Sequence, residues 1–227
     1  MIRTRTSRYP AAPSELPREG PCSRLLRMML PTIFRPSWKL EELFACKLHA
    51  YGEVPIRDDV QVCWIYRLKD LRPEHKALLT GHLGQLGWAM WEWRLIRRFS
   101  CVALARWRGQ TVHYAFVSYG GGVMKPYAKA MFDNSAIVGP CYTAPQARGN
   151  GIYPYVVAWA LARLKASGRR WAYIHTSCTN KASLKGIRKI PAWIHVGRFL
   201  LRRPAFRRYR IEAATIVDPS AIPPSSC

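Results

Sequence analysis

Runs of apolar, β-branched and aromatic residues, broken by glycine and charged residues, predict five strands. Residues 101–107 and 111–119 are separated only by Arg108-Gly109-Gln110, which is typical of a hairpin. Residues 171–178 are apolar on both alternating faces, as in a strand covered on each side. One or two less defined strands follow before Ile216. The five predicted strands cover 60–68, 101–107, 111–119, 135–143 and 171–178.

Other segments have helical patterns. Residues 38–51 can form a helix that begins at Ser37, with acidic residues in its early turns. Residues 73–97 are interpreted as helical with breaks at three glycines, and 180–189 as a helix with Asn180 at its start. The spacing of apolar residues in 149–166 predicts one buried stripe. Residues 135–178 therefore form a unit of strand, glycine-rich turn, helix and strand.

The chain divides into four segments by composition. Residues 1–36 are basic and rich in Arg, Ser and Pro, which favours a disordered tail over a transit peptide. Residues 37–59 are expected to be an N-terminal extension, and 60–216 a single globular domain. Residues 217–227 are expected to be a flexible tail.

The charge balance restricts both partners and chemistry. A formal net charge of +23 attracts anions, so nucleic acid, anionic lipid, an acidic carrier protein and phosphorylated small molecules are all candidate partners. Between Trp93 and Ile211 the only carboxylate side chain is that of Asp133. A general base supplied by this region is therefore not expected to be a carboxylate.

Cysteine usage and apolar runs indicate the compartment. Seven widely spaced cysteines include no Cys-x-x-Cys pair, so we expect no zinc or other metal site and a reducing cytoplasm. The longest apolar stretch, 153–164, is interrupted by Pro154 and is shorter than the roughly 20 residues of a membrane span. No transmembrane helix is expected.

The turn before the 149–166 helix is a candidate anion site. Free backbone N–H groups and the helix dipole favour a phosphate there, while Gly149 and Gly151 permit close approach and Arg148 adds a charge. A glycine-rich turn alone is weak evidence, because glycines at helix starts are common. A dinucleotide fingerprint is excluded, since Pro154 replaces the third glycine.

Two motifs resemble the GNAT superfamily of acyl-CoA N-acyltransferases. Gln146-Ala147-Arg148-Gly149-Asn150-Gly151 is similar to the family pattern Gln/Arg-x-x-Gly-x-Gly/Ala, and Asn180-Lys181-Ala182-Ser183 to its Asn-x-x-Ser stretch. The resemblance covers about residues 60–209. It implies a mixed α/β fold with a twisted, mostly antiparallel sheet, flanked by helices and splayed open at the fourth strand, 135–143.

The same resemblance implies where acetyl-CoA or another acyl-CoA would bind as co-substrate. Backbone atoms of the fourth strand would pair with pantetheine as an added strand does, amides of the turn would hold the pyrophosphate, and an asparagine side chain would meet the pantetheine arm. The residues implied are Cys141, Tyr142 and Thr143 on the strand, Gln146, Arg148, Gly149, Asn150, Gly151 and Ile152 at the turn, and Asn180.

The acid and base are harder to assign. Many family members carry a tyrosine seven residues after the asparagine as general acid, but Ile187 stands there, and the fourth strand has no glutamate. Tyr142 and Ser183 are the preferred catalytic candidates, although Tyr142 could equally line the pocket and histidines on strands are often packing residues. The full set of candidates for proton transfer is Tyr142, Cys178, Ser183, His175 and His113.

The function predicted is direct transfer of an acyl group, acetyl being the expected one, from acyl-CoA to a primary amine of a small molecule or amino sugar. One alternative is a long-chain donor on an acyl carrier protein, docked by the arginines at 202, 203, 207, 208 and 210. A basic nucleic-acid-binding protein is the other alternative. It would use Arg94, Arg97, Arg98, Arg106 and Arg108 with Trp91, Trp93 and Trp107.

Overall fold

The computed structural model describes residues 37–217 apart from 55, 98, 120–133 and 204–209. Eight strands in this part of the chain form one sheet in the order β2-β3-β4-β5-β6-β1-β7-β8. Neighbouring strands are antiparallel, except β5 and β6, which are parallel. The strands span Ser37–Lys47 (β1), Val60–Ile65 (β2), Ser100–Trp107 (β3), Gln110–Tyr119 (β4), Ser135–Thr143 (β5), Trp171–Ser177 (β6), Ile194–Arg203 (β7) and Arg210–Ile216 (β8).

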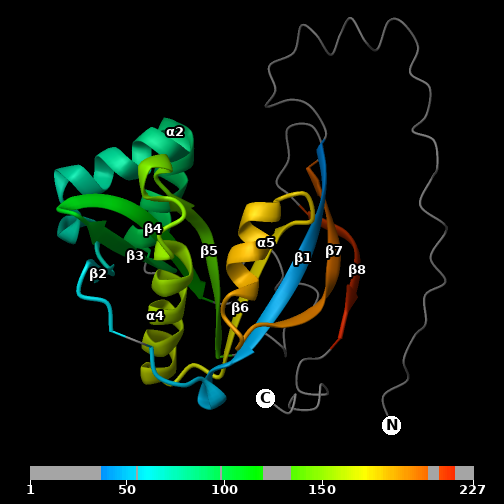
Figure 1. Ribbon diagram of the computed structural model, residues 1–227. Helices are drawn as coiled ribbons and strands as arrows, with labels where there is room; N and C mark the ends of the chain where they lie inside the picture. Colours follow the sequence, from blue (N-terminus) through cyan, green and yellow to red (C-terminus); the bar gives the residue numbers. More distant parts are fainter. Residues whose placement is uncertain (1–36, 55, 98, 120–133, 204–209, 218–227) are drawn as a thin grey trace, which may run out of the picture.

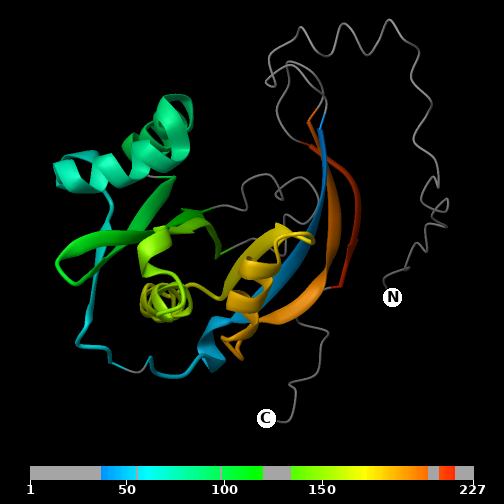
Figure 2. The ribbon, with the colours of Figure 1, turned by 45° about the horizontal axis from the view of Figure 1, so that its top comes forward.

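Helices cover both faces of the β3–β5 part of the sheet (Figure 1). The predicted helix over 73–97 is confirmed as α2, Pro73–Ile96, and its backbone leaves helical geometry at Gly84. Helix α4, Ile152–Ala166, packs on the opposite face, as Figure 2 shows for β3 and β4. These two sides are called the α2 face and the α4 face below.

The β3–β4 hairpin is confirmed, and its turn explains the local sequence. Arg108 and Gly109 both have positive φ, 50° and 78°, as a tight two-residue hairpin turn requires. The paired strands then present successive residues to opposite faces. Phe116 packs against Trp91 of α2 at a ring distance of 4.0 Å, whereas Val117 belongs to the core beneath α4.

The helix predicted over 38–51 is wrong. Residues 37–47 form β1, which lies inside the sheet between β6 and β7, and only Leu48–Ala50 make a short 3-10 turn. Leu43 and Ala45 are buried on one face, and Phe44 and Cys46 on the other. The expected boundary at residue 60 therefore does not separate this segment from the sheet.

The sheet opens between β5 and β6, as the sequence resemblance implies. The two strands pair only from Ser135↔Trp171 to Val138↔Ile174. Beyond that point β5 stays paired with β4, β6 stays paired with β1, and the two strands diverge toward the top of Figure 1. We call this unpaired stretch, residues 139–143 of β5 and 175–177 of β6, the parting.

Helix α5, Lys181–Arg188, follows β6 and lies beside the first turn of α4. Asn180 caps it, as predicted, by accepting a hydrogen bond from the Ser183 amide at 3.1 Å. The ring of Tyr153 in α4 lies against α5 at Gly186, where a Cβ would come within 2.5 Å of two ring carbons. Glycine at 186 thus allows the two helices to approach.

Candidate functional site

The turn between β5 and α4 presents a row of free amides. Gly149 and Gly151 have φ of 82° and 70°, a left-handed conformation that favours glycine. The amides of residues 149–153 have no acceptor among the described residues, and the first helical bond runs from the Tyr155 amide to Gly151. The Arg148 amide differs from the expectation, because it donates to the Pro145 carbonyl within the short turn 145–147.

An arginine from a distant loop fixes this turn. Arg57, which precedes β2, donates to the Asn150 carbonyl at 2.9 Å and forms a two-point ion pair with Asp59. Its guanidinium also lies 5.5 Å from the centre of the Tyr155 ring. Arg57 was not among the predicted site residues, because 93 positions separate it from its partner. By bonding the Asn150 carbonyl, Arg57 fixes the turn and leaves its amides free.

The Arg148 side chain connects the turn with the parting. Its Nε donates to the Thr143 carbonyl at 3.1 Å, and its guanidinium carbon lies 5.9 Å from the centre of the Tyr142 ring. Asn180 lies at the other side of the parting, after β6, with its Oδ1 engaged in the cap. Gln146 is exposed in the short turn. The predicted donor-binding residues therefore lie along the end of β5 and the two helix starts.

On the α4 face, two buried polar atoms beside the parting have no partner among the described residues. They are the hydroxyl of Tyr153 and Nε2 of His113. Nδ1 of His113 is bonded to the Thr143 hydroxyl at 2.8 Å, and its ring meets that of Tyr153 edge-on at 6.0 Å. A buried polar group left unpaired costs about 1–3 kcal/mol, so such atoms are uncommon in a finished core.

The surroundings of the Tyr153 hydroxyl place it between β5 and α5. Its pKa is raised chiefly by burial and also by Cys141, while the Ser183 side chain opposes that shift. Ser183 is therefore close, although it makes no hydrogen bond of acceptable geometry with the phenol. The tyrosine hydroxyl thus faces the residues that the sequence assigned to the donor and to catalysis.

The α2 face of the parting carries an aromatic stack that sequence reasoning missed. His82 of α2 lies on the Tyr142 ring at 3.7 Å, nearly parallel, and its Nδ1 is 2.6 Å from the Tyr114 hydroxyl. Burial lowers the pKa of His82, and the positive Arg148 lowers it further. A neutral imidazole at this position can accept a proton. His82 belongs to no motif in the sequence, so only the folded structure assigns it to this face.

Several of the predicted proton-transfer residues have environments that restrict their roles. Burial lowers the pKa of His113 to about 3, so the cation is strongly disfavoured and the residue is a poor general base. Burial raises the pKa of Cys141 to about 12, which keeps it a thiol rather than a nucleophilic thiolate. Ile187 is fully buried in the core beneath α4. The backbone N–H of Cys178 donates a hydrogen bond to the Leu40 carbonyl.

Strand β1 brings two carboxylates into a region whose own sequence is almost free of them. Glu41 and Glu42 are 6% and 8% exposed, and each lies beside a histidine. Glu41 Oε2 is 3.1 Å from Nδ1 of His175, and Glu42 Oε2 is 2.6 Å from Nε2 of His195. The scarcity of acids between residues 93 and 211 is therefore no limit on the chemistry of the folded chain.

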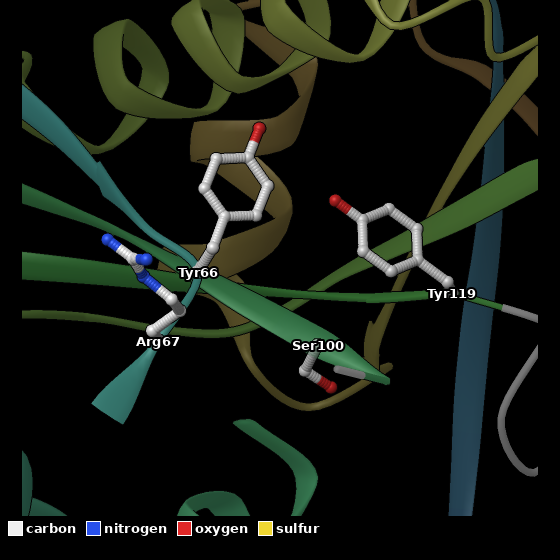
Figure 3. A pocket seen from close by; sticks show the side chains of 4 residues that line it. All are labelled: Tyr66, Arg67, Ser100 and Tyr119. Atoms are coloured by element: carbon white, nitrogen blue, oxygen red, sulfur yellow. The ribbon is translucent and has the colours of Figure 1, made fainter. Parts of the chain in front are cut away.

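A separate pocket of about 350 Å³ lies where β3 begins and β4 ends (Figure 3). Tyr66, Arg67, Ser100 and Tyr119 line it, and Figure 3 shows the two phenol hydroxyls directed to the same side. This is the end of β4 opposite to His113, which pairs with Thr143. None of the predicted site residues lines this pocket.

The aromatic and basic residues behind the nucleic-acid alternative are partly in the core. Trp91 is buried against Phe116, and the Arg94 guanidinium lies over Trp91 and donates to Ser100. Trp107 donates to Asp59 and carries Arg108 at 4.2 Å. Arg98 lies outside the described residues, as do the side chains of four arginines of the C-terminal cluster. The interleaved pattern thus reflects helix and hairpin packing.

Three further features concern metal sites, cysteines and membrane spans in the described part of the chain. No group of three or more His, Cys, Asp or Glu residues there is placed to hold a metal ion. Its five cysteines, at positions 46, 63, 101, 141 and 178, are unpaired. None of its helices is long and apolar enough to cross a membrane.

Comparison with solved structures identifies the fold. An acetyltransferase from Colwellia psychrerythraea, described as a GNAT-family protein, matches 72% of the chain with TM-score 0.51 and 15% identity. A protein from Novosphingobium aromaticivorans assigned to the same family matches 75% with TM-score 0.51 and 18% identity. A fungal GCN5-related glucosamine N-acetyltransferase region, within a multi-domain β-N-acetylglucosaminidase, matches 86% with TM-score 0.54 and 17% identity.

The chain has the GNAT fold. It spans 56% of the Colwellia chain, 66% of the Novosphingobium chain and 24% of the fungal chain. No family model matches the sequence, and no curated protein is significantly similar to it. At these identities the likeness establishes architecture, and activity must be argued from the site.

Proposed function

We propose that this protein is an N-acyltransferase that transfers an acyl group, acetyl in the first instance, from acyl-CoA to a primary amine. The observation that carries the proposal is the row of free amides at residues 149–153, directly after the strand whose far edge is unpaired. Oriented N–H groups at a helix start favour a pyrophosphate. An unpaired strand edge suits the amides of pantetheine.

A bound acyl-CoA would occupy both the row of free amides and the unpaired strand edge. The pyrophosphate lies on the amides of Gly149 to Tyr153, with Arg148 and its permanent charge beside it. Pantetheine runs along the backbone of Cys141 to Thr143 toward the parting. The orphaned hydroxyl of Tyr153 then gains a polar partner. The Asn180 side-chain amide nitrogen, which the helix cap leaves free, faces the arm.

Chemistry follows by direct attack of the amine on the thioester carbonyl. A strand N–H at the parting polarises that carbonyl as negative charge develops. Cys141 remains a thiol, which argues against an acyl-enzyme intermediate. Tyr142 and Ser183 lie on opposite faces of the parting. There Tyr142 can contact the donor beside the acyl carbon, and Ser183 can contact the leaving thiol. No metal is needed. The unpaired cysteines favour a reducing cytoplasm as the site of this activity.

The acceptor is proposed to be a small amine, and amino sugars belong to the first set to be tried. The fungal neighbour that is described as a glucosamine N-acetyltransferase motivates that choice. A carrier-protein donor has no support from the described residues. Comparing acetyl-CoA with an acyl carrier protein as donor separates the two readings.

The direct test replaces one glycine at the turn and one elsewhere. Gly149→Leu forces a side chain into a left-handed conformation at the proposed pyrophosphate site, and Gly109→Leu does the same in the β3–β4 hairpin. Each costs about 1–2 kcal/mol of backbone strain. Calorimetric titration with CoA should show at least about tenfold weaker binding for Gly149→Leu only. Equal binding by both variants and the unmodified protein would refute the proposed donor site.

A further inference from the structure

The two carboxylates of β1 lie on opposite faces of the sheet and are held differently. Adjacent strand residues point to opposite sides, so Glu41 and Glu42 serve different faces. Glu42 is bonded to His195 and also to Nε of Arg198 at 2.8 Å. Burial raises the pKa of Glu42, but the hydrogen bonds from Arg198 and His195 outweigh it and lower the pKa. Glu42 is thus neutralised by a permanent cation.

Glu41 has no such cation among the described residues. Its partner is His175, whose side chain is 29% exposed, compared with 47% for His195. A buried carboxylate is stabilised by a donor or a positive charge, and here one imidazole must supply it. Because the carboxylate accepts, Nδ1 of neutral His175 carries the proton and Nε2 carries the lone pair. No described residue bonds to that nitrogen.

His175 is the first residue of β6 beyond the last pair with β5, Val138↔Ile174. Its ring contacts Phe199 edge-on at 5.4 Å, in the cluster that contains Tyr173 and Ile137. It therefore lies at the mouth of the parting, on the face that α4 and α5 do not cover.

This face is the one that carries Tyr142. Ile137 pairs with both Tyr173 and Ser118, and Tyr142 pairs with Tyr114. Residues 114 and 118 of β4 point to the same side of the sheet, so their partners Tyr142 and Ile137 do so too. Tyr173 pairs with Ile137 and extends this side to β6, where His175, two residues later, points the same way. His175 with Glu41 on one strand, and Tyr142 with His82 opposite, thus flank the end of the proposed donor channel.

We propose that His175 is the general base that accepts the proton of the acceptor amine, and that Glu41 is its positioning residue. This inference rests on the proposed acyltransferase function. As the amine nitrogen forms its bond to the carbonyl carbon, Nε2 takes the N–H proton and later releases it to water. The C–S bond breaks, and its electron pair leaves with the CoA sulfur, which is protonated from solvent or a neighbouring hydroxyl. The carboxylate of Glu41 stabilises the imidazolium that forms.

The groups that surround His175 come from β1, from β7 and from the far side of the parting. Glu41 is the charged group that faces it from β1, Phe199 is the residue in contact from β7, and Tyr142 and His82 lie across the parting. Removal of the Glu41 charge would take that stabilisation away from the imidazolium that forms during transfer, so kcat should fall.

The experiment uses full-length His175→Gln, Glu41→Gln and, as matched control, His195→Gln. Thiol release from acetyl-CoA is followed with glucosamine, 1,4-diaminobutane, tyramine and lysine as acceptors, and CoA binding is measured by calorimetry. His175→Gln should lower kcat about 100-fold and abolish the acidic limb of kcat/KM, with CoA affinity unchanged. Glu41→Gln should lower kcat and leave KM and CoA affinity unchanged, because the imidazolium loses its stabilising carboxylate. His195→Gln should stay within about twofold of the unmodified protein.

Each failure has a separate meaning. Unmodified protein that does not bind CoA refutes the acyltransferase function itself. Protein that binds CoA but transfers to none of these amines overturns the assignment of His175 while leaving the donor site standing. The assignment also falls if His175→Gln retains more than a third of kcat, or if His195→Gln loses as much activity as His175→Gln.

Discussion

The hydroxyl of Tyr153 provides a prediction in which stability and binding change in opposite directions. Tyr153→Phe removes one oxygen and keeps the ring that packs against Gly186 and His113. In the free protein that oxygen is buried without a partner, a state that costs about 1–3 kcal/mol. The variant should therefore be more stable by about 1 kcal/mol. For a chain of this size, that raises Tm by about 2–4 °C.

Binding should move the other way, because the donor is proposed to supply the missing partner. Loss of one hydrogen bond of about 1 kcal/mol weakens CoA binding roughly fivefold. Thermal unfolding by circular dichroism and calorimetric titration with CoA measure the two effects separately. Together they distinguish a functional hydroxyl from a structural one.

Tyr119→Phe is the matched control. Its hydroxyl lies 3.1 Å from the Cys101 sulfur and is thus partnered inside the fold, away from the parting. This variant should unfold at a lower temperature and bind CoA normally. The reasoning on Tyr153 fails if Tyr153→Phe lowers Tm by more than about 2 °C, or if its CoA affinity equals that of the unmodified protein.

Two further predictions concern stability. The pKa of His113 is lowered to about 3 by burial, so between pH 6.5 and 3 the unfolded chain binds a proton there that the folded chain does not, and stability falls toward acid by up to about 1.4 kcal/mol per pH unit. His113→Asn, which can still bond to Thr143, should show a shallower acid slope in urea unfolding, and an unchanged slope would contradict the burial argument. Gly186→Ala should destabilise the fold by about 1–3 kcal/mol through overlap with the Tyr153 ring, whereas Gly81→Ala, on an open helix surface, should stabilise it by about 0.5–1 kcal/mol. Equal effects of the two alanines on Tm would show that the predicted overlap relaxes without cost.

The elements that were predicted correctly are those whose turn, cap or apolar pattern is encoded by neighbouring residues. The hairpin at Arg108 and Gly109, the strand 135–143 and the helix that Asn180 caps all have their signals within a few residues. The helix predicted over 38–51 was wrong for the opposite reason, because the contacts that make this segment a strand are distant in sequence. Two adjacent glutamates in an apolar run are typical of a helix start, and their partners as strand residues, His175, His195 and Arg198, lie more than 130 positions away.

Local motifs also marked part of the candidate site. The turn at Gly149 and Gly151 and the cap at Asn180 were visible as motifs, and the structure brings them to two sides of one parting. Arg57 and His82 were not visible, because each acts on the site from an element that reaches it only in the folded sheet. Their roles depend on tertiary distance rather than on neighbours in the sequence.

The position of β1 also sets an order in which the chain can fold. Of the described strands β1 is made before the others, yet the strands on both its sides, β6 and β7, are made more than 120 residues later. Closing loops of that length precedes any gain from pairing, and such non-local contacts are associated with slow folding. During synthesis, Leu43 and Phe44 must remain exposed or find temporary cover until β7 is complete. Strands β7 and β8 thus join the rest of the sheet through a strand that waits for nearly the whole chain.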